Sequence, residues 1–449
     1  MRDSNFLVEN NARHVWHPMA HPGEMRAQPP KIVHEAEGVE VIDVHGHRLL
    51  DAVGGLWNVN LGYSCEPVKK AMRDQLDRLP YYSAFRGSTT SPLIELSFEL
   101  VEWFKPDGMA RAFLTSGGSD SVETCLRLAR QYHKLTDQPE RTKYIALKKG
   151  YHGTHFGAAS INGNQNFRRQ YEPLLPGCFH IPAPWTYRNP FGTDDAAVVA
   201  ERCAAMLEDE IAFQGADTIA AFIMEPVLGA GGVIVPHESF MGRIREICSR
   251  HGILLIADEV ITGFGRTGAW TGSRLWGVKP DLMSTAKAVT NGYFPLGAVM
   301  IGEKLVDAFE ADKTGKAAIG HGYTYSGHPV GAAAALAALA ETTRLDVASN
   351  AAARGAELMA GLEKLKARHS LVGDVRGKGL MAALELVSDR AQKTPASKDT
   401  LQRVFDTAYQ RGVMVRTSGN IVILSPPLII TSSDVARIVD ALDAAHGSA

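Results

Sequence analysis

The sequence predicts an α/β protein with a largely parallel central sheet and a smaller α+β region built from both ends of the chain. Short β-rich runs alternate with helical stretches from about residue 111 to 302, as they do where helices join the strands of a parallel sheet. After residue 327 the pattern changes to an Ala-rich helix followed by a mixture of strands and helices. The 449 residues also exceed what one hydrophobic core usually supports.

The expected elements can be placed in chain order. Residues 40–51 alternate apolar and polar side chains around His45-Gly46, which predicts a hairpin. The strand candidates are RAFLT (111–115), KYIALK (143–148), TIAAFIMEPV (218–227), ILLIADEV (253–260), GAVMIG (297–302), LMAALELV (380–387) and IVILSPPLII (421–430). Helices are expected at 121–133, 237–251, 330–345, 351–368, 400–411 and 433–445. We expect a large domain over 56–326 and a small domain formed by 1–55 and 327–449.

Composition argues against several classes of partner. The chain carries 47 Lys and Arg against 49 Asp and Glu, so it has no net field that would hold nucleic acid or an anionic membrane. Five scattered cysteines form no close pair, and the polar N-terminus lacks the apolar core of a signal peptide. We therefore expect a cytoplasmic protein whose partners are small molecules and other protein chains.

A possible phosphate site lies at residues 115–120, TSGGSD, between a strand and a helix. Glycines let the backbone approach an anion, and the first amides of the helix point at it. The Ser119 hydroxyl could add a donor. By itself such a turn is more often a structural helix cap.

A carboxylate and an amine follow at two later strand ends. Asp258 ends a buried strand, at the edge where open α/β sheets bind ligands, and it could hold a protonated pyridine nitrogen or cap the next turn. Lys287 stands in a small, apolar segment, where burial would lower the pKa of its amine as a Schiff-base lysine requires. A lone lysine there would more often extend to solvent. A phosphate cup, a ring carboxylate and a buried amine together match what a phosphorylated pyridine aldehyde needs.

From Trp57 to Pro427 the sequence resembles the class III, ω-type aminotransferases of pyridoxal 5'-phosphate (PLP) fold type I. The most specific segments are IADEVITGFGRTG (256–268), STAKAVTNGYFPLGAV (284–299) and HGYTYSGHP (321–329). The resemblance implies that Lys287 carries PLP as a Schiff base, that Asp258 pairs with the ring nitrogen, and that Tyr151 stacks on the ring opposite Val260. The cofactor contacts it implies are Ser116, Gly117, Gly118, Ser119, Tyr151, His152, Glu225, Asp258, Val260, Lys287 and Thr324.

The resemblance also concerns assembly. Thr324 corresponds to a threonine that reaches the phosphate of the neighbouring subunit, which implies a homodimer, or a dimer of dimers, with shared active sites. Asp120 stands where many relatives carry Glu, and Gly117 where Ser is frequent, but both changes keep a small turn and an acid. His152 and His155 have a spacing that a metal could use, yet no further ligands are evident, and we expect a structural role.

The function implied is a ping-pong transfer of an amino group from an ω-amino acid or amine, such as β-alanine, taurine, a diamine or an arylalkylamine, to pyruvate, giving alanine. Arg416 would bind the keto acid carboxylate through its planar guanidinium, and Trp57 would form the flat wall of the donor pocket. Pyruvate as the acceptor rests on the resemblance alone.

Three alternatives remain. A PLP racemase or aminomutase would use the same Lys287 and Asp258 but return the amine to its own substrate. A dinucleotide-binding reductase is disfavoured because Gly229, Gly231 and Gly232 follow no G-x-G-x-x-G frame. A non-catalytic PLP-binding protein is disfavoured by the intact lysine, aspartate and tyrosine.

Overall fold

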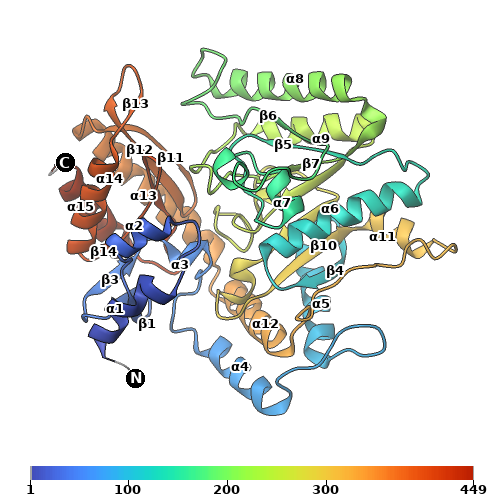
Figure 1. Cartoon of the computed structure of the whole chain (residues 1–449), viewed down its shortest axis with the longest axis horizontal. Coiled ribbons are helices and arrows are strands. Elements are labelled where there is room, and N and C mark those ends of the chain that lie inside the picture. Colours follow the sequence, from blue (N-terminus) through green and yellow to red (C-terminus); the bar gives the residue numbers. More distant parts are fainter. Residues whose placement is uncertain (1–2, 448–449) are drawn as a thin grey trace.

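The structure is a computed structural model that describes residues 3–447. The chain forms two lobes that lie side by side, with the middle of the sequence in the large lobe and both chain ends in the small lobe (Figure 1). The predicted α/β class is confirmed. The domain boundaries at residues 55 and 326 stay a prediction.

A mostly parallel sheet forms the centre of the large lobe. Among residues 3–447 it has seven strands, in the spatial order β4 (Met109–Thr115), β10 (Gly297–Gly302), β9 (Leu282–Thr285), β8 (Leu254–Asp258), β7 (Ile219–Met224), β5 (Lys143–Leu147) and β6 (Cys178–Ile181). The strand β10 runs antiparallel to β4 and β9, and the other neighbours are parallel. Consequently β4, β5, β7, β8 and β9 all end at the same edge.

Helices cover both faces of this sheet. Successive residues of a strand point to opposite faces, so Phe222 packs with the core beneath one layer of helices and Ile223 with the core beneath the other. The first layer contains α5 (Ser91–Phe104), α8 (Ala196–Gln214), α9 (Ser239–His251) and α12 (Pro329–Arg344), and the second contains α6 (Gly118–Leu135) and α11 (Glu303–Glu310). Burial on both faces explains the unbroken apolar runs of the strands.

The small lobe is built from both ends of the chain. One sheet contains β1 (Val33–Glu37), β2 (Glu40–Asp43), β3 (Arg48–Asp51) and β14 (Val413–Met414), so it joins an N-terminal hairpin to a C-terminal strand. The other contains β11 (Val372–Lys378), β12 (Met381–Asp389), β16 (Ile421–Leu424) and β15 (Arg416–Ser418), and β13 (Thr394–Pro395) pairs with β12. The lobe's helices are α1 (Ser4–His14), α2 (Pro22–Ala27), α13 (Val347–Arg368), α14 (Lys398–Gln410) and α15 (Ser432–Gly447).

The remaining elements are short or link the lobes. They are α3 (Gly54–Trp57), α4 (Glu66–Arg78), α7 (Phe156–Ser160), α10 (Gly272–Leu275), and the 3₁₀ turns η1 (Lys105–Asp107), η2 (Gln165–Phe167), η3 (Ala216–Thr218) and η4 (Lys287–Thr290). None of the helices described between residues 3 and 447 is long and apolar enough to cross a membrane.

The predicted hairpin at 40–51 is confirmed as β2 and β3, and the predicted helices lie within a few residues of the observed ones. Several strand predictions were too long: TIAAFIMEPV (218–227) runs past the end of β7 at Met224, ILLIADEV (253–260) runs past the end of β8 at Asp258, and IVILSPPLII shows the largest excess. IVILSPPLII was expected to continue to residue 430, but β16 ends at Leu424. Pro426 and Pro427 have no amide hydrogen and cannot donate to a strand ladder.

Candidate active site

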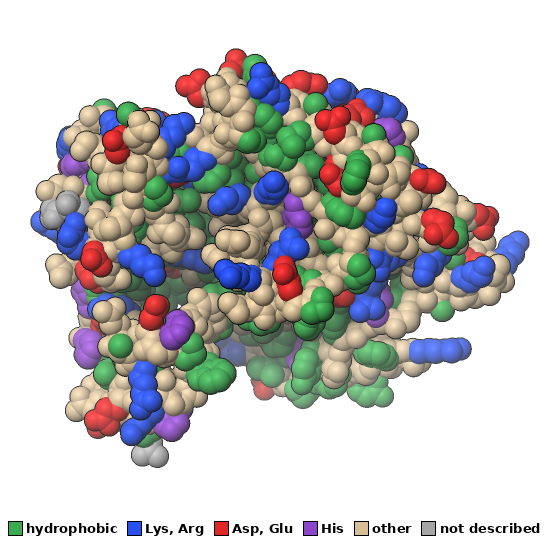
Figure 2. Space-filling model, turned by 45° about the horizontal axis from the view of Figure 1, so that its top comes forward, with side chains coloured by type: hydrophobic (Ala, Val, Ile, Leu, Met, Phe, Trp, Pro, Cys, Tyr) green, Lys and Arg blue, Asp and Glu red, His purple; other side chains and the backbone are tan. Residues whose placement is uncertain are grey.

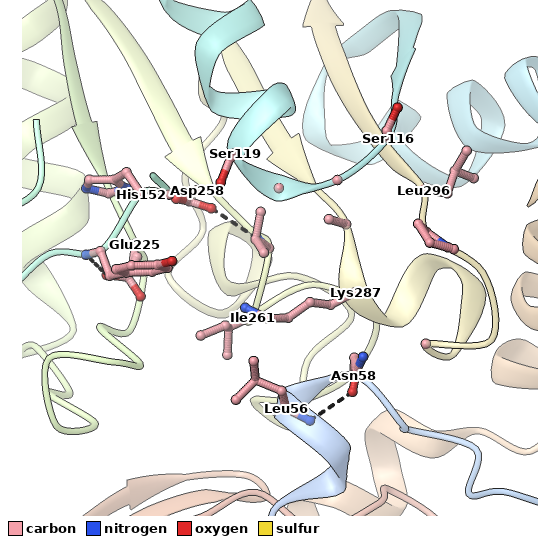
Figure 3. A pocket seen from close by; sticks show the side chains of 18 of the residues that line it. Leu56, Asn58, Ser116, Ser119, His152, Glu225, Asp258, Ile261, Lys287 and Leu296 are labelled. Atoms are coloured by element: carbon pink, nitrogen blue, oxygen red, sulfur yellow. Dashed lines mark hydrogen bonds and ion pairs between the residues drawn. The ribbon is translucent and has the colours of Figure 1, made fainter. Parts of the chain in front are cut away.

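A cavity of about 380 Å³ lies where the strands of the central sheet end. Figure 3 shows Lys287 reaching into it, with Asp258 on one side and Leu56 and Asn58 on the other. Its lining residues are Leu56, Asn58, Ser116, Gly117, Gly118, Ser119, Tyr151, His152, Gly153, Glu225, Asp258, Val260, Ile261, Ala286, Lys287, Gly292, Phe294, Pro295 and Leu296.

Strand direction explains why residues far apart in sequence meet here. β8 ends at Asp258, and β9 ends at Thr285, two residues before Lys287. β7 ends one residue before Glu225, and β4 ends just before the turn at Gly117. These strands run in one direction, so their carboxyl ends deliver all four segments to one edge of the sheet.

The turn at 116–119 forms an open helix start. α6 begins at Gly118 without a capping side chain, so the first amides of the helix are left for another acceptor. Asp120 closes the turn by accepting a hydrogen bond from the Ser116 amide at 3.0 Å, so the Asp at this position keeps the turn in place. A Cβ atom on Gly118 would lie 3.1 Å and 3.2 Å from the two Val260 methyl groups, which shows how closely Val260 covers the turn.

Asp258 is buried and firmly oriented. Its Oδ1 accepts hydrogen bonds from the Ser284 hydroxyl at 3.0 Å and the Val260 amide at 3.2 Å. Its Oδ2 lies 2.8 Å from Nδ1 of His152, and an ionised carboxylate can only accept, so that nitrogen is the donor. His152 thus acts through Asp258, and its own Nε2 is buried without a partner in the described part of the chain.

Lys287 has an unusual backbone and a perturbed amine. Its φ is +48°, a left-handed conformation that costs free energy for a residue with a side chain. Burial lowers the pKa of its amine to about 8, although the negative charges of Asp258 and Glu225 act in the opposite direction. No residue between 3 and 447 makes a hydrogen bond to its Nζ atom, so the amine is free to react.

Glu225 and Tyr151 form the side of the pocket next to His152. Glu225 accepts hydrogen bonds from the Tyr151 amide at 2.9 Å and the Gly229 amide at 2.8 Å. Burial raises the pKa of Glu225 to about 7, with Asp258 adding to the shift and His152 opposing it. The Tyr151 ring packs edge-on against Phe167, with 5.0 Å between the ring centres, so the ring is held at the pocket wall.

Three residues expected at the site lie outside this cavity. Trp57 is only 2% exposed and packs in an apolar cluster that includes Ile261, so its neighbour Leu56 forms the wall expected of the indole. Burying the large indole gives more apolar contact than exposing it at the cavity. Arg416 is half-buried on β15, and its charge still lowers the pKa of Lys287. Thr324 is exposed on the surface, where its carbonyl accepts from the Tyr81 hydroxyl at 2.7 Å.

Sequence reasoning missed Leu56 and Asn58, which enter the site from the N-terminal segment (Figure 3). The Asp51 carboxylate holds this segment by accepting from the amides of residues 53–55. Asn291 ties the segment to the loop after Lys287, because its side chain bonds the Leu61 amide at 2.6 Å. The neighbouring glycines at 54 and 55 were the only local signal of a special turn.

Arg266, in the GFGRTG segment, is fully buried. Its guanidinium donates to the carbonyl groups of Leu380 and Pro426 and to the side chain of Asn60. It thereby joins the large lobe to two segments of the small lobe. Burial lowers the pKa of Arg266 to about 9, although the negative charge of Asp51 acts in the opposite direction.

The residues of the cavity fit pyridoxal 5'-phosphate. The uncapped start of α6 with Ser119 suits a phosphate group. Asp258 suits a protonated ring nitrogen, and the unpaired Lys287 amine suits an aldehyde carbon. Val260 provides an apolar surface between the phosphate cup and the lysine.

Comparison with known proteins supports this interpretation. Residues 23–445 match the family Aminotransferase class-III. An amine transaminase from an uncultivated Pseudomonas species, solved in its PLP-bound form, is 46% identical, with a TM-score of 0.95 over 97% of this chain and 98% of that one. An (S)-enantioselective omega-transaminase from Thermomicrobium roseum is 37% identical, with a TM-score of 0.95 over 100% and 99% of the two chains.

A putrescine–pyruvate aminotransferase from Pseudomonas aeruginosa is 36% identical over 93% of this chain and 90% of its own length. Both the sequence and the fold agree with these relatives. The chain therefore belongs to the class III aminotransferase family, and it is a PLP-dependent aminotransferase of fold type I.

Proposed function

We propose that this aminotransferase moves the amino group of an ω-amino acid or amine to pyruvate, giving alanine. The observation that carries the proposal is the free Lys287 amine, with a pKa near 8, in the same cavity as Asp258 and the uncapped start of α6. The reaction has two halves. A donor leaves its nitrogen in the site and departs as an aldehyde or ketone, and pyruvate then takes that nitrogen and departs as alanine.

The cofactor would be held by groups already described. The phosphate would bind at the amides of residues 117–119 with the Ser119 hydroxyl, and the ring nitrogen at Asp258. Tyr151 and Val260 would cover the two ring faces. When bound, PLP supplies a carbonyl carbon that reacts with primary amines and a cationic ring that withdraws electrons from the adjacent carbon.

Lys287 would serve as the acid–base group. With PLP bound, its amine would move a proton between the substrate carbon and the carbon next to the ring, in one direction in the first half-reaction and in the other direction in the second. Burial suits the task, because a pKa near 8 leaves a useful neutral fraction near neutral pH. His152 supports the reaction indirectly by holding Asp258 in place.

Arg416 would recognise the carboxylate of the keto acid. Its position supports this role, since its charge acts on both Lys287 and Tyr151 although it does not line the cavity. A guanidinium can bind a carboxylate through two parallel hydrogen bonds. Pyruvate as the acceptor is also supported by the name of the Pseudomonas aeruginosa relative, which acts on putrescine and pyruvate.

The site is proposed to be completed by a second copy of the chain, in a homodimer or a dimer of dimers. Thr324 would reach the partner's phosphate site. Its carbonyl accepts from the Tyr81 hydroxyl, the Tyr81 ring packs against Tyr325, and Tyr82, Phe85 and Tyr325 are exposed. Hydrophobic side chains also gather along the lower edge of the view in Figure 2. We further propose a cytoplasmic location, in keeping with five unpaired cysteines.

A donor panel tests the proposed reaction. β-Alanine, taurine, putrescine and an arylalkylamine would each be incubated with pyruvate or 2-oxoglutarate, and the amino acid product would be identified. Alanine from at least one donor supports the proposal, and glutamate alone would move the acceptor to 2-oxoglutarate. Racemised or rearranged amine without any keto acid would instead indicate a racemase or aminomutase.

A further inference from the structure

A fully buried carboxylate joins the two lobes. Glu385, on β12, is 0% exposed and binds two arginines. Its Oε1 accepts from Nε of Arg188 at 2.5 Å, and its Oε2 accepts from Nη1 of Arg376 at 3.0 Å. Asn420 approaches the same Oε1 atom at 3.5 Å. Such a carboxylate is costly to bury unless its partners are fixed.

These partners come from both lobes. Arg188 follows β6 in the large lobe, and its Nη2 also donates to the Lys393 carbonyl of the small lobe at 2.6 Å. Arg376 lies on β11 in the small lobe, and its Nε donates to the Gly232 carbonyl of the large lobe at 2.8 Å. The two arginines therefore cross between the lobes in opposite directions, and Glu385 binds both.

The same carboxylate lies at the tip of the hairpin that carries Arg416. In this hairpin Arg416 pairs with Ile423, and Glu385 stands opposite Ile421 at the start of the returning strand. Asn420, in the turn, donates its side-chain amide to the Leu386 carbonyl at 2.8 Å and its backbone carbonyl accepts from the Leu386 amide at 2.8 Å. The tip is thus fixed to β12 beside Glu385.

We propose that Glu385 is a positioning residue. It holds the Arg416 guanidinium where it can bind the carboxylate of the keto acid acceptor. This inference rests on the role proposed above for Arg416. Neutralising Glu385 would weaken its bonds to Arg188 and Arg376 and loosen the hairpin tip against the large lobe. Binding of a keto acid needs a precisely placed guanidinium, whereas an uncharged aldehyde does not.

The variant Glu385→Gln keeps the shape of the side chain and removes its charge. We expect the KM for pyruvate to rise about tenfold while kcat changes less than about twofold. Kinetics with an uncharged aldehyde acceptor and the visible absorbance of the bound cofactor should stay as in the wild type. Hydrogen exchange of the peptide 413–424 should become faster. Equal losses with both acceptors would mean a purely structural role and would overturn the proposal.

A double-mutant cycle tests whether Glu385 acts through Arg416. Arg416→Ala should also be selective for pyruvate, and adding Glu385→Gln to it should cause no further selective loss. Additive losses would overturn the proposal. If Arg416→Ala showed no selectivity, the acceptor role of Arg416 would fail, and this inference with it. If Arg416→Ala were selective and Glu385→Gln were not, only this inference would fail.

Two further variants serve as controls for the loss of a buried charge and for a failure of Glu385→Gln to fold. Asp107→Asn is the matched control, because Asp107 is equally buried and pairs with Arg274 far from the hairpin in sequence. It should cause no acceptor-selective change. If Glu385→Gln does not fold, Asn420→Ala leaves the carboxylate and both arginines intact and still frees the hairpin tip. It should reproduce the selective rise in KM, and an unchanged KM would overturn the proposal.

Discussion

The ionisation of Lys287 should control how fast the chain without cofactor takes up PLP. Only the neutral amine can attack the aldehyde, and burial lowers the pKa of this amine from 10.5 to about 8. At pH 7 a pKa of about 8 leaves about 10% of the amine neutral, against about 0.03% at the ordinary value. The site should therefore react about 300-fold faster at pH 7 than an exposed lysine of equal reactivity.

The uptake can be followed as the rise in visible absorbance after PLP is mixed with cofactor-free protein at a series of pH values. Because burial lowers the pKa of the Lys287 amine in the folded chain, the rate of PLP uptake should rise through about pH 8 and level off above about pH 9. Glu225→Gln removes a charge that raises this pKa, so the midpoint should move lower. Glu259→Gln is the control, since that buried carboxylate binds Ser273 and Thr262 instead. A midpoint near 10 would refute the reasoning.

The other predictions concern single parts of the proposed reaction. Lys287→Ala should abolish turnover, and borohydride should no longer attach the cofactor to the chain; cofactor trapped on another lysine in the wild-type protein would contradict this. Arg416→Ala should lose about 10- to 150-fold in kcat/KM with pyruvate and much less with an uncharged aldehyde, from the loss of a charge-assisted contact of about 1.5–3 kcal/mol. Equal losses would leave carboxylate recognition unassigned. Light scattering should show a dimer or tetramer at assay concentration, and Thr324→Ala should weaken PLP binding measured by equilibrium dialysis; a fully active monomer would rule out shared sites.

Local sequence carried most of the information about the cavity. Buried parallel strands are readable as apolar runs, and their carboxyl ends meet at one edge of the sheet. Asp258 and Lys287 stand at or just after such ends, and Gly118 opens the helix after a third. Their approach to one another follows from strand direction, which is why short motifs could place them.

Contacts between residues far apart in the sequence could not be predicted from local patterns. Leu56 reaches the cavity because Asp51 holds the turn before it and Asn291 binds the segment after it from 230 residues away. The Trp57 side chain points into the core because an apolar cluster between the lobes accommodates its indole. The pair of Arg188 and Glu385 spans 197 residues and leaves no pattern in either segment.

The close packing of Gly118 and Val260 has a consequence for how this chain can change. A methyl group at residue 118 would lie 3.1 Å from a Val260 methyl, so the two positions share one volume. The order in which these two positions are substituted therefore matters. Enlarging residue 118 first requires Val260 to shift by a few tenths of an ångström, whereas making Val260 smaller first removes that contact. Laboratory evolution that alters the phosphate turn should therefore acquire its change at 260 first.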